Sequence, residues 1–144
     1  MEKTETDNSK RLLNNRAAIN FLVKTFYAKV RKDEMLGPIF NAQVQNWPEH
    51  LERLTDFWQT NLLFQRAYKG NPVKAHIDTD KQVGGSITTE HFGRWLQLWF
   101  GTIDQHFEGE HADRAKNHSR KMSTHLFMRI FQSRDGLPKI NLTE

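Results

Sequence analysis

The chain has 144 residues, a formal net charge of +4 and no cysteine. This length favours one domain with a single substantial core, and the lack of cysteine excludes disulfides, thiolate metal sites and cysteine nucleophiles. The polar start MEKTETDNSK has no apolar signal core, and no apolar run approaches the length of a membrane span. We therefore expect a soluble, cytoplasmic protein with no membrane partner.

Helical spacing begins after a polar tail at residues 1–14. Apolar residues recur at helical intervals over residues 15–32, which predicts the first helix. Gly37-Pro38 then favours a stop and a turn, so we expect an irregular connector there. Residues 46–65 reopen with an Asn-Trp-Pro start and carry the apolar face of a second long helix.

The second half of the chain contains a short helical segment and two long ones. The stretch KGNPVKAHIDTD is heavily punctuated, which indicates one or two helical turns from Pro72 to about His76. KQVGGS, residues 81–86, is predicted to be a loop. Residues 87–107 have the clearest helical spacing in the chain, and residues 111–134 form a last amphipathic helix.

No segment has the alternation typical of β-strands. We therefore predict an all-α fold with four main helices and a short fifth, in one domain over residues 15–134, followed by a polar tail at 135–144. These patterns alone do not distinguish a plain helical bundle from an orthogonal helical sandwich.

The basic charge balance raises nucleic acid as a partner. However, the densest basic stretches, KVRK and RKMSTHLFMR, do not form long blocks, and the other charges are dispersed. A solvated basic surface accounts for this pattern, so we expect no nucleic-acid partner. A helical regulatory module, or a nucleic-acid-binding one, is the alternative function.

The seven histidines do not have the spacing of a zinc or di-iron site. Ligands on helices recur at i,i+3 or i,i+4, and no two of these histidines do. His111, His118 and His125 recur every seven residues, which separates neighbours by about 10 Å along a helix, too far for one ion. A polar or half-buried helix face accounts for that trio.

Three aromatic or imidazole side chains place polar groups on apolar helix faces. Tyr27 lies on the apolar face of the first helix and Trp95 on the inward face of the clearest one. His50 shares a face with Leu54 and Trp58. Each residue alone is more simply a core residue. Together they could place polar groups in an apolar cavity, as a haem pocket requires.

Four segments, in order, resemble a known family: FYAKVRKDEMLGPIF (26–40), WPEHLERLTDFW (47–58), YKGNPVKAH (68–76) and HFGRWLQLW (91–99). Over roughly residues 17–132 the chain resembles the bacterial truncated haemoglobins of group III. The resemblance implies a truncated globin fold, a two-over-two helical sandwich around haem b (iron protoporphyrin IX).

The resemblance also implies roles for individual residues. His76 matches the proximal ligand of a five-coordinate iron. The residues that match the distal polar positions are Tyr27, His50 and Trp95. Those that match aromatic or apolar contacts of the macrocycle are Phe40, Leu54, Trp58 and Phe92. Arg53 is a candidate partner of a haem propionate, and His91 is a rival axial ligand by position.

The resemblance implies a protein that binds O2 and other diatomic ligands such as CO and NO. No extra apolar stripe stands out on the predicted helix surfaces, so we expect a monomer. Two distal donors would retain O2, which suits O2, NO or peroxide chemistry better than bulk transport. Dioxygenation of NO, or peroxidase-like turnover, would need an external reductase. The stretch IDTDKQVGGSITTE after His76 is long and carries two glycines, so we expect it to be more mobile than is usual in the family.

Overall fold

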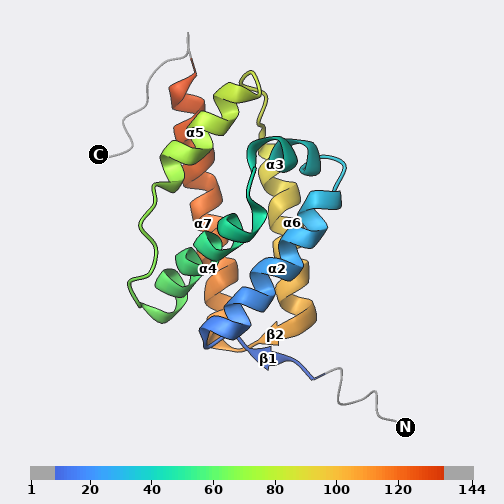
Figure 1. Ribbon diagram of the computed structural model, residues 1–144, viewed down its shortest axis with the longest axis vertical. Helices are drawn as coiled ribbons and strands as arrows, with labels where there is room; N and C mark the ends of the chain where they lie inside the picture. Colours follow the sequence, from blue (N-terminus) through green and yellow to red (C-terminus); the bar gives the residue numbers. More distant parts are fainter. Residues whose placement is uncertain (1–8, 135–144) are drawn as a thin grey trace.

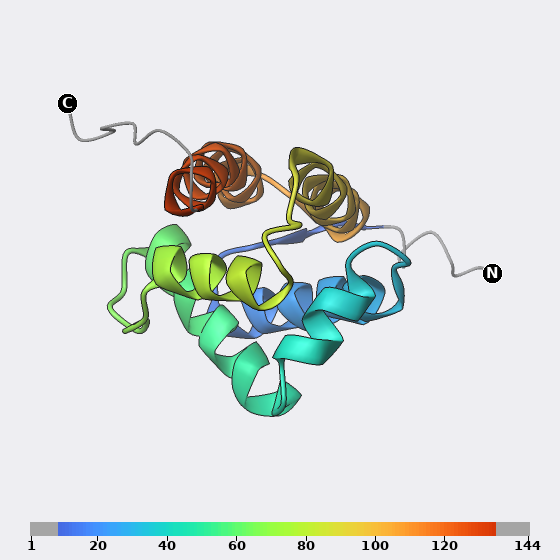
Figure 2. The same ribbon diagram turned by 90° about the horizontal axis from the view of Figure 1, so that it is seen from above.

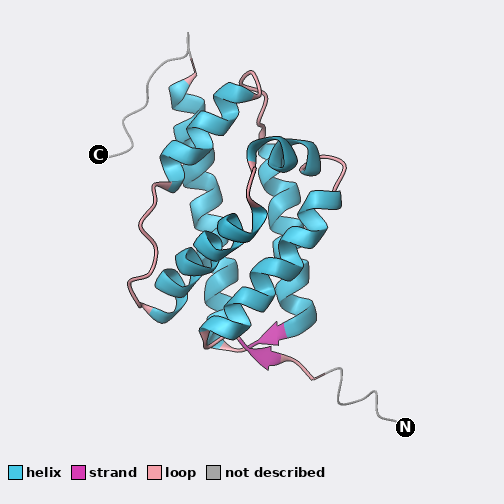
Figure 3. Ribbon diagram, in the orientation of Figure 1, coloured by secondary structure: helices cyan, strands magenta, loops and turns pink. Residues whose placement is uncertain are grey.

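The computed structural model describes residues 9–134. The all-α prediction is confirmed, since helices form nearly all of the regular structure (Figures 1 and 3). The elements in chain order are β1 (Arg11–Leu12), α2 (Arg16–Lys32), α3 (Gly37–Gln43), α4 (Trp47–Leu63), α5 (Pro72–Gln82), α6 (Thr89–His106), β2 (Phe107–Glu108) and α7 (Glu110–Ser133).

The four long helices form two layers, as the family resemblance implied. Helix α2 packs against α4, and α6 packs against α7, with one pair lying over the other (Figure 2). Helix α3 packs on α2, and α5 lies against α7. No helix within residues 9–134 is both long and apolar enough to cross a membrane.

Asparagine caps fix where three of the helices begin. The side-chain oxygens of Asn15, Asn46 and Asn71 accept hydrogen bonds from backbone N–H groups three residues on, at 2.9, 3.1 and 3.0 Å. Such caps satisfy N–H groups that have no partner within the helix. Proline follows in the first turn of α4 and α5, where its missing N–H removes no helical bond.

Two predicted segments were wrong in extent. The expected irregular connector contains α3 (Gly37–Gln43), because Pro38 begins a helix instead of ending one. The expected one or two turns after Pro72 continue as α5 to Gln82. The Asn-Pro pair there is the cap and first turn of α5, and no glycine follows until Gly84. The four main helices agree with prediction to within about two residues at each end.

A short strand pair extends the packed region toward the N-terminus. Arg11 pairs with Phe107 and Leu12 with Glu108, in parallel. The sequence had indicated no strand, because two residues are too few for a visible alternation. The pair brings Leu13 into the core, where it is fully buried, although it falls in the predicted tail at 1–14. The predicted tail at 135–144 lies outside the described residues.

Candidate functional site

His76 lies one turn inside α5, and its ring is held by the backbone of the same helix. Its Nδ1 atom is 2.6 Å from the carbonyl oxygen of Pro72. A carbonyl can only accept, so Nδ1 carries the proton and donates it. The other ring nitrogen, Nε2, then keeps a lone pair. This is the state of an imidazole that can bind a metal.

Burial favours the neutral form of this ring. Removal from water lowers the pKa of His76 below its ordinary value, and the hydrogen bond to Pro72 opposes this more weakly. The ring of Phe92, on α6, lies nearly parallel to it, with centroids 6.3 Å apart and 24° between the planes. Phe127, on α7, meets the edge of Phe92 at 5.9 Å. His76 therefore faces an apolar aromatic wall.

Tyr27 and Trp95 form a second group of site residues, on α2 and α6. Tyr27 is buried, with 5% of its surface exposed. Burial raises the pKa of its hydroxyl, and a hydrogen bond with the Trp95 side chain opposes this. The indole N–H can only donate, so the Tyr27 oxygen accepts. Trp95 therefore does not accept the Tyr27 proton.

Other aromatic rings surround Tyr27. Phe40, on α3, lies 5.7 Å from it between ring centroids, and His50, on α4, lies 6.2 Å away and nearly perpendicular. Trp47, on α4, is 6.0 Å from Tyr27 and 5.5 Å from His50. Sequence reasoning missed Trp47 as a site residue. Its spacing three residues before His50, on one helix face, is a signal that could have found it.

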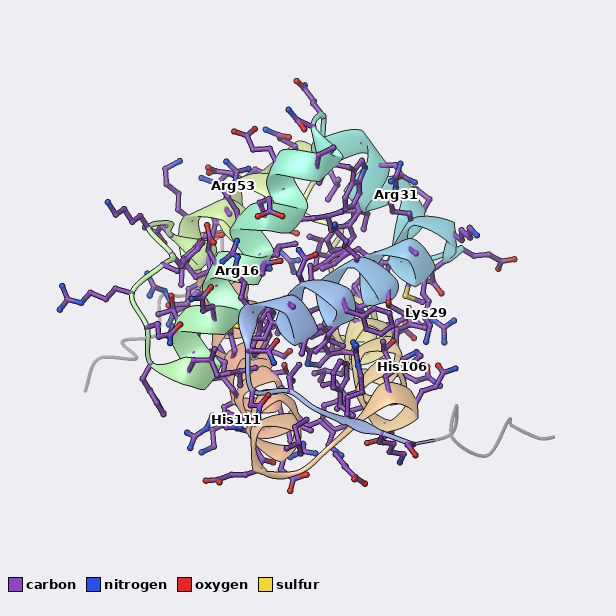
Figure 4. All side chains as sticks on the ribbon, turned by 60° about the horizontal axis from the view of Figure 1, so that its bottom comes forward. Arg16, Lys29, Arg31, Arg53, His106 and His111 are labelled. Atoms are coloured by element: carbon purple, nitrogen blue, oxygen red, sulfur yellow. The ribbon has the colours of Figure 1, made fainter. Side chains whose placement is uncertain are left out.

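His50 and Arg53 lie on α4 one turn apart. Burial lowers the pKa of His50, and the positive charge of Arg53 lowers it further. Arg53 is exposed on the outside of α4 (Figure 4). Its charge also acts on Tyr68, in the loop between α4 and α5, whose pKa is raised mainly by burial. Arg53 therefore stands near both a distal candidate and the loop that leads to His76.

Trp58, which matches a wall position of the haem pocket in the resemblance, is buried in the core, with 2% of its surface exposed. Its ring stacks on Trp99 at 4.9 Å, and Trp99 stacks on Trp95 at 5.3 Å, each pair with 27° between the planes. The stack links Trp58 to the distal group through the core. The indole N–H of Trp99 is buried and has no hydrogen-bond partner within residues 9–134. Leu54, one turn before Trp58, is half-buried against the same core.

The rival ligand His91, and also His118, have structural partners. His91 completes a capping box at the start of α6, where its Nδ1 accepts the Thr88 backbone N–H at 2.9 Å. His118 packs against the rings of Phe57 and Trp58. In the part of the chain that the structure describes, no three His, Asp or Glu side chains are grouped so that they could hold a metal ion.

A surface hollow of about 690 Å³ lies along the first half of α7. Charged and polar residues line most of it, among them Glu110, Asp113, Arg114 and Lys121. None of the residues assigned above to the haem lines it. A macrocycle needs apolar walls, so this hollow does not suit it.

The residues around His76 and Tyr27 fit a haem. The chain offers one neutral imidazole with a free lone pair, aromatic side chains beside it, and a buried hydroxyl whose proton is not held by Trp95. A haem iron needs one protein ligand, apolar walls and a few hydrogen-bond donors on its other face. The structure brings Tyr27, Trp95, His50 and Phe40 together, and it separately pairs His76 with Phe92.

Comparisons with known proteins agree with this interpretation. No model of a protein family matches the chain. A curated relative, the "Group 3 truncated hemoglobin ctb" of Campylobacter jejuni, is 31% identical over 116 residues, which cover 78% of this chain and 87% of the relative. The crystal structure of a group III truncated hemoglobin from Campylobacter jejuni superposes with a TM-score of 0.73 at 30% identity, covering 82% of this chain and 92% of that one. The chain belongs to the group III truncated haemoglobins, and its two-over-two helical sandwich is a truncated globin fold.

Proposed function

We propose that this globin binds haem b through His76 and holds O2, or other diatomic ligands such as CO and NO, beside Tyr27, His50 and Trp95. The observation that carries the proposal is the bond between His76 Nδ1 and the Pro72 carbonyl, at 2.6 Å. It fixes the tautomer that leaves Nε2 able to bind iron. Haem, when bound, supplies the iron at which the diatomic ligand sits.

The distal residues have distinct tasks in this proposal. Tyr27 donates its hydroxyl proton to the bound ligand. Trp95 orients that hydroxyl, because its N–H occupies one lone pair of the Tyr27 oxygen. His50, half-buried on α4, stands beside Tyr27 and gates entry of the ligand. In surroundings with little water, such hydrogen bonds are stronger than in solution.

The remaining assigned residues hold the macrocycle. Phe40, Leu54, Trp58 and Phe92 supply apolar or aromatic surface. Arg53, exposed near Tyr68, pairs with a propionate. We place the protein in the cytoplasm as a monomer.

Retention of O2 favours chemistry at the ligand over bulk transport. A charge-assisted hydrogen bond contributes roughly 1.5–3 kcal/mol, so the bond donated by Tyr27, whose hydroxyl Trp95 orients, would slow release of O2. Turnover of NO or of a peroxide would need electrons from an external reductase.

The test is a titration of the purified chain with hemin, followed by reduction under CO. The proposal predicts an intense Soret band that saturates at one hemin per chain and moves sharply when CO binds. A spectrum equal to that of free hemin at every ratio would contradict it. The aromatic groups would then be core packing in a haem-free helical module.

A further inference from the structure

Asp80 is a buried carboxylate one turn after His76 on α5. Only 1% of its surface is exposed. A buried charge is costly unless it is paired and hydrogen-bonded. Asp80 lies near the end of the helix that carries His76. The partner that pairs with its charge therefore also contacts that helix.

The partner of Asp80 is Arg134, which follows the last residue of α7. The guanidinium Nε lies 3.2 Å from Oδ2 of Asp80, and Nη2 lies 3.1 Å from Oδ1. Asp80 Oδ1 also accepts the backbone N–H of Ile87 at 3.1 Å. Arg134 donates in turn to the backbone carbonyl of Ile87. These contacts join the ends of α5 and α7 and the segment that leads to α6.

The glycine-rich loop closes around this pair. Gly84 and Gly85 have φ values of +74° and +71°, which a residue with a side chain rarely adopts. The N–H of Gly85 donates to the backbone oxygen of Asp80 at 2.7 Å. A Cβ atom at Gly85 would stand 3.9 Å from Arg134 Nε. The segment after His76, which we expected to be mobile, therefore forms several hydrogen bonds with the end of α5.

A second route connects Arg134 to His76 through aromatic rings. The guanidinium lies 6.0 Å from the centroid of the Phe127 ring. Phe127 meets the edge of Phe92 at 5.9 Å, and Phe92 stacks on His76 at 6.3 Å. Two chains of contacts thus connect Arg134 to His76. One runs through Asp80 and the backbone of α5, and the other through the rings of Phe127 and Phe92. Figure 1 shows α5 beside the end of α7, where these contacts occur.

We propose that Asp80 and Arg134 are positioning residues for His76. The Pro72 carbonyl fixes the ring relative to α5, so the placement of α5 against α7 sets where Nε2 points. The pair clamps the far end of α5 and thereby holds the imidazole at one tilt to the bound iron. This inference rests on the proposed function, because it assigns His76 to iron.

The test compares Asp80→Asn and Arg134→Lys with a matched control, Asp78→Asn. Asp78 lies on the same helix and pairs with Lys74 at 2.6 Å, but both side chains of that pair are substantially exposed. The control removes the same charge from the same helix and breaks an ion pair of small energetic value. Amide hydrogen exchange of the full chain as purified, and the iron–histidine stretching frequency of the ferrous, ligand-free protein, are measured for each.

We expect exchange of the α5 amides to accelerate about tenfold or more in Asp80→Asn, because the partly buried Arg134 guanidinium loses its charged partner. The iron–histidine frequency should shift or broaden in both variants of the pair and stay at the wild-type value in Asp78→Asn. Arg134→Lys keeps the charge and loses the two-point geometry, so it carries the test if Asp80→Asn does not fold.

A wild-type iron–histidine frequency in a folded variant of the pair would overturn the inference, even if its melting temperature fell, because a purely structural role lowers stability without tilting the ring. An equal shift in Asp78→Asn would overturn it as well. Failure of the proposed function is distinct, since the wild-type chain would then take up no haem.

Discussion

His76 Nδ1 lies 2.6 Å from the carbonyl oxygen of Pro72, one turn earlier in the same helix. Pro72, in the first turn of α5, has no N–H, but its carbonyl oxygen lies within hydrogen-bonding distance of the His76 ring. The bond fixes the tautomer of His76, and burial lowers its pKa. Together they keep a lone pair on Nε2 at neutral pH.

The stability of the purified chain should fall in acid. Burial lowers the pKa of His50, His76, His106 and His118 in the folded state. The unfolded chain then binds more protons below its histidine pKa of about 6.5, so stability rises with pH in that window and is lost as pH falls below it. Urea unfolding at pH 7 and pH 5 measures this.

The contribution of His76 to that loss can be isolated. His76→Gln cannot gain a proton, so its difference in unfolding free energy between pH 7 and pH 5 should be smaller than in the wild type. His125→Gln, on an exposed position of α7, is the control. An unchanged pH difference in His76→Gln would show that burial of His76 does not matter for folding.

Loss of the Trp95 N–H should speed release of O2. In Trp95→Phe, the Tyr27 hydroxyl loses the donor that orients it and its own proton can turn away from the ligand. A charge-assisted bond of roughly 1.5–3 kcal/mol corresponds to an off-rate about tenfold to a hundredfold higher. Stopped-flow displacement of O2 by CO in the reconstituted protein gives the rate.

Tyr27→Phe, alone and combined with Trp95→Phe, tests whether the two residues act as one unit. If Trp95 works by orienting Tyr27, the double variant should release O2 no faster than Tyr27→Phe. Fully additive effects would assign Trp95 its own bond to the ligand. An off-rate equal to wild type in Trp95→Phe would remove this residue from the distal group.

Both tyrosines of the chain should resist ionisation. Burial raises the pKa of Tyr27 and of Tyr68. The absorbance of tyrosinate should therefore show less than half ionisation at about pH 10, where tyrosine in an unfolded chain is half ionised. Tyr68→Phe leaves Tyr27 as the one remaining signal. Half ionisation of that variant at the unfolded value would mean that Tyr27 is open to solvent.

Trp99 should tolerate loss of its N–H better than loss of its bulk. The indole N–H has no partner within residues 9–134, so its desolvation is uncompensated. Trp99→Ala should destabilise by about 3–5 kcal/mol, and Trp99→Phe by clearly less. Urea unfolding of both variants measures the difference. Equal losses would indicate that the N–H has a bonding role.

Local sequence signals predicted the parts of the site that lie within one helix. The cap at Asn46 and the period of α6 follow from short-range rules, and the resemblance supplied His76. Trp47 was missed although its spacing to His50 was visible. The full length of α5 was missed because Asn71-Pro72 was interpreted as a turn when it is a cap followed by a first helical turn.

Long-range pairs could not be predicted in this way. Asp80 and Arg134 are 54 residues apart in sequence and meet only because α5 lies against α7. Leu13 enters the core through a strand pair with a partner more than 90 residues away. Nothing local to either residue marks these contacts.

The most direct test of the account is the visible spectrum of hemin-loaded His76→Gly, reduced under CO, with and without imidazole, beside His91→Asn. We predict that His76→Gly lacks the wild-type spectrum and regains it when imidazole fills the space left by the side chain, while His91→Asn matches the wild type. A wild-type spectrum in His76→Gly without imidazole, or its loss in His91→Asn, would contradict the assignment of His76 to iron.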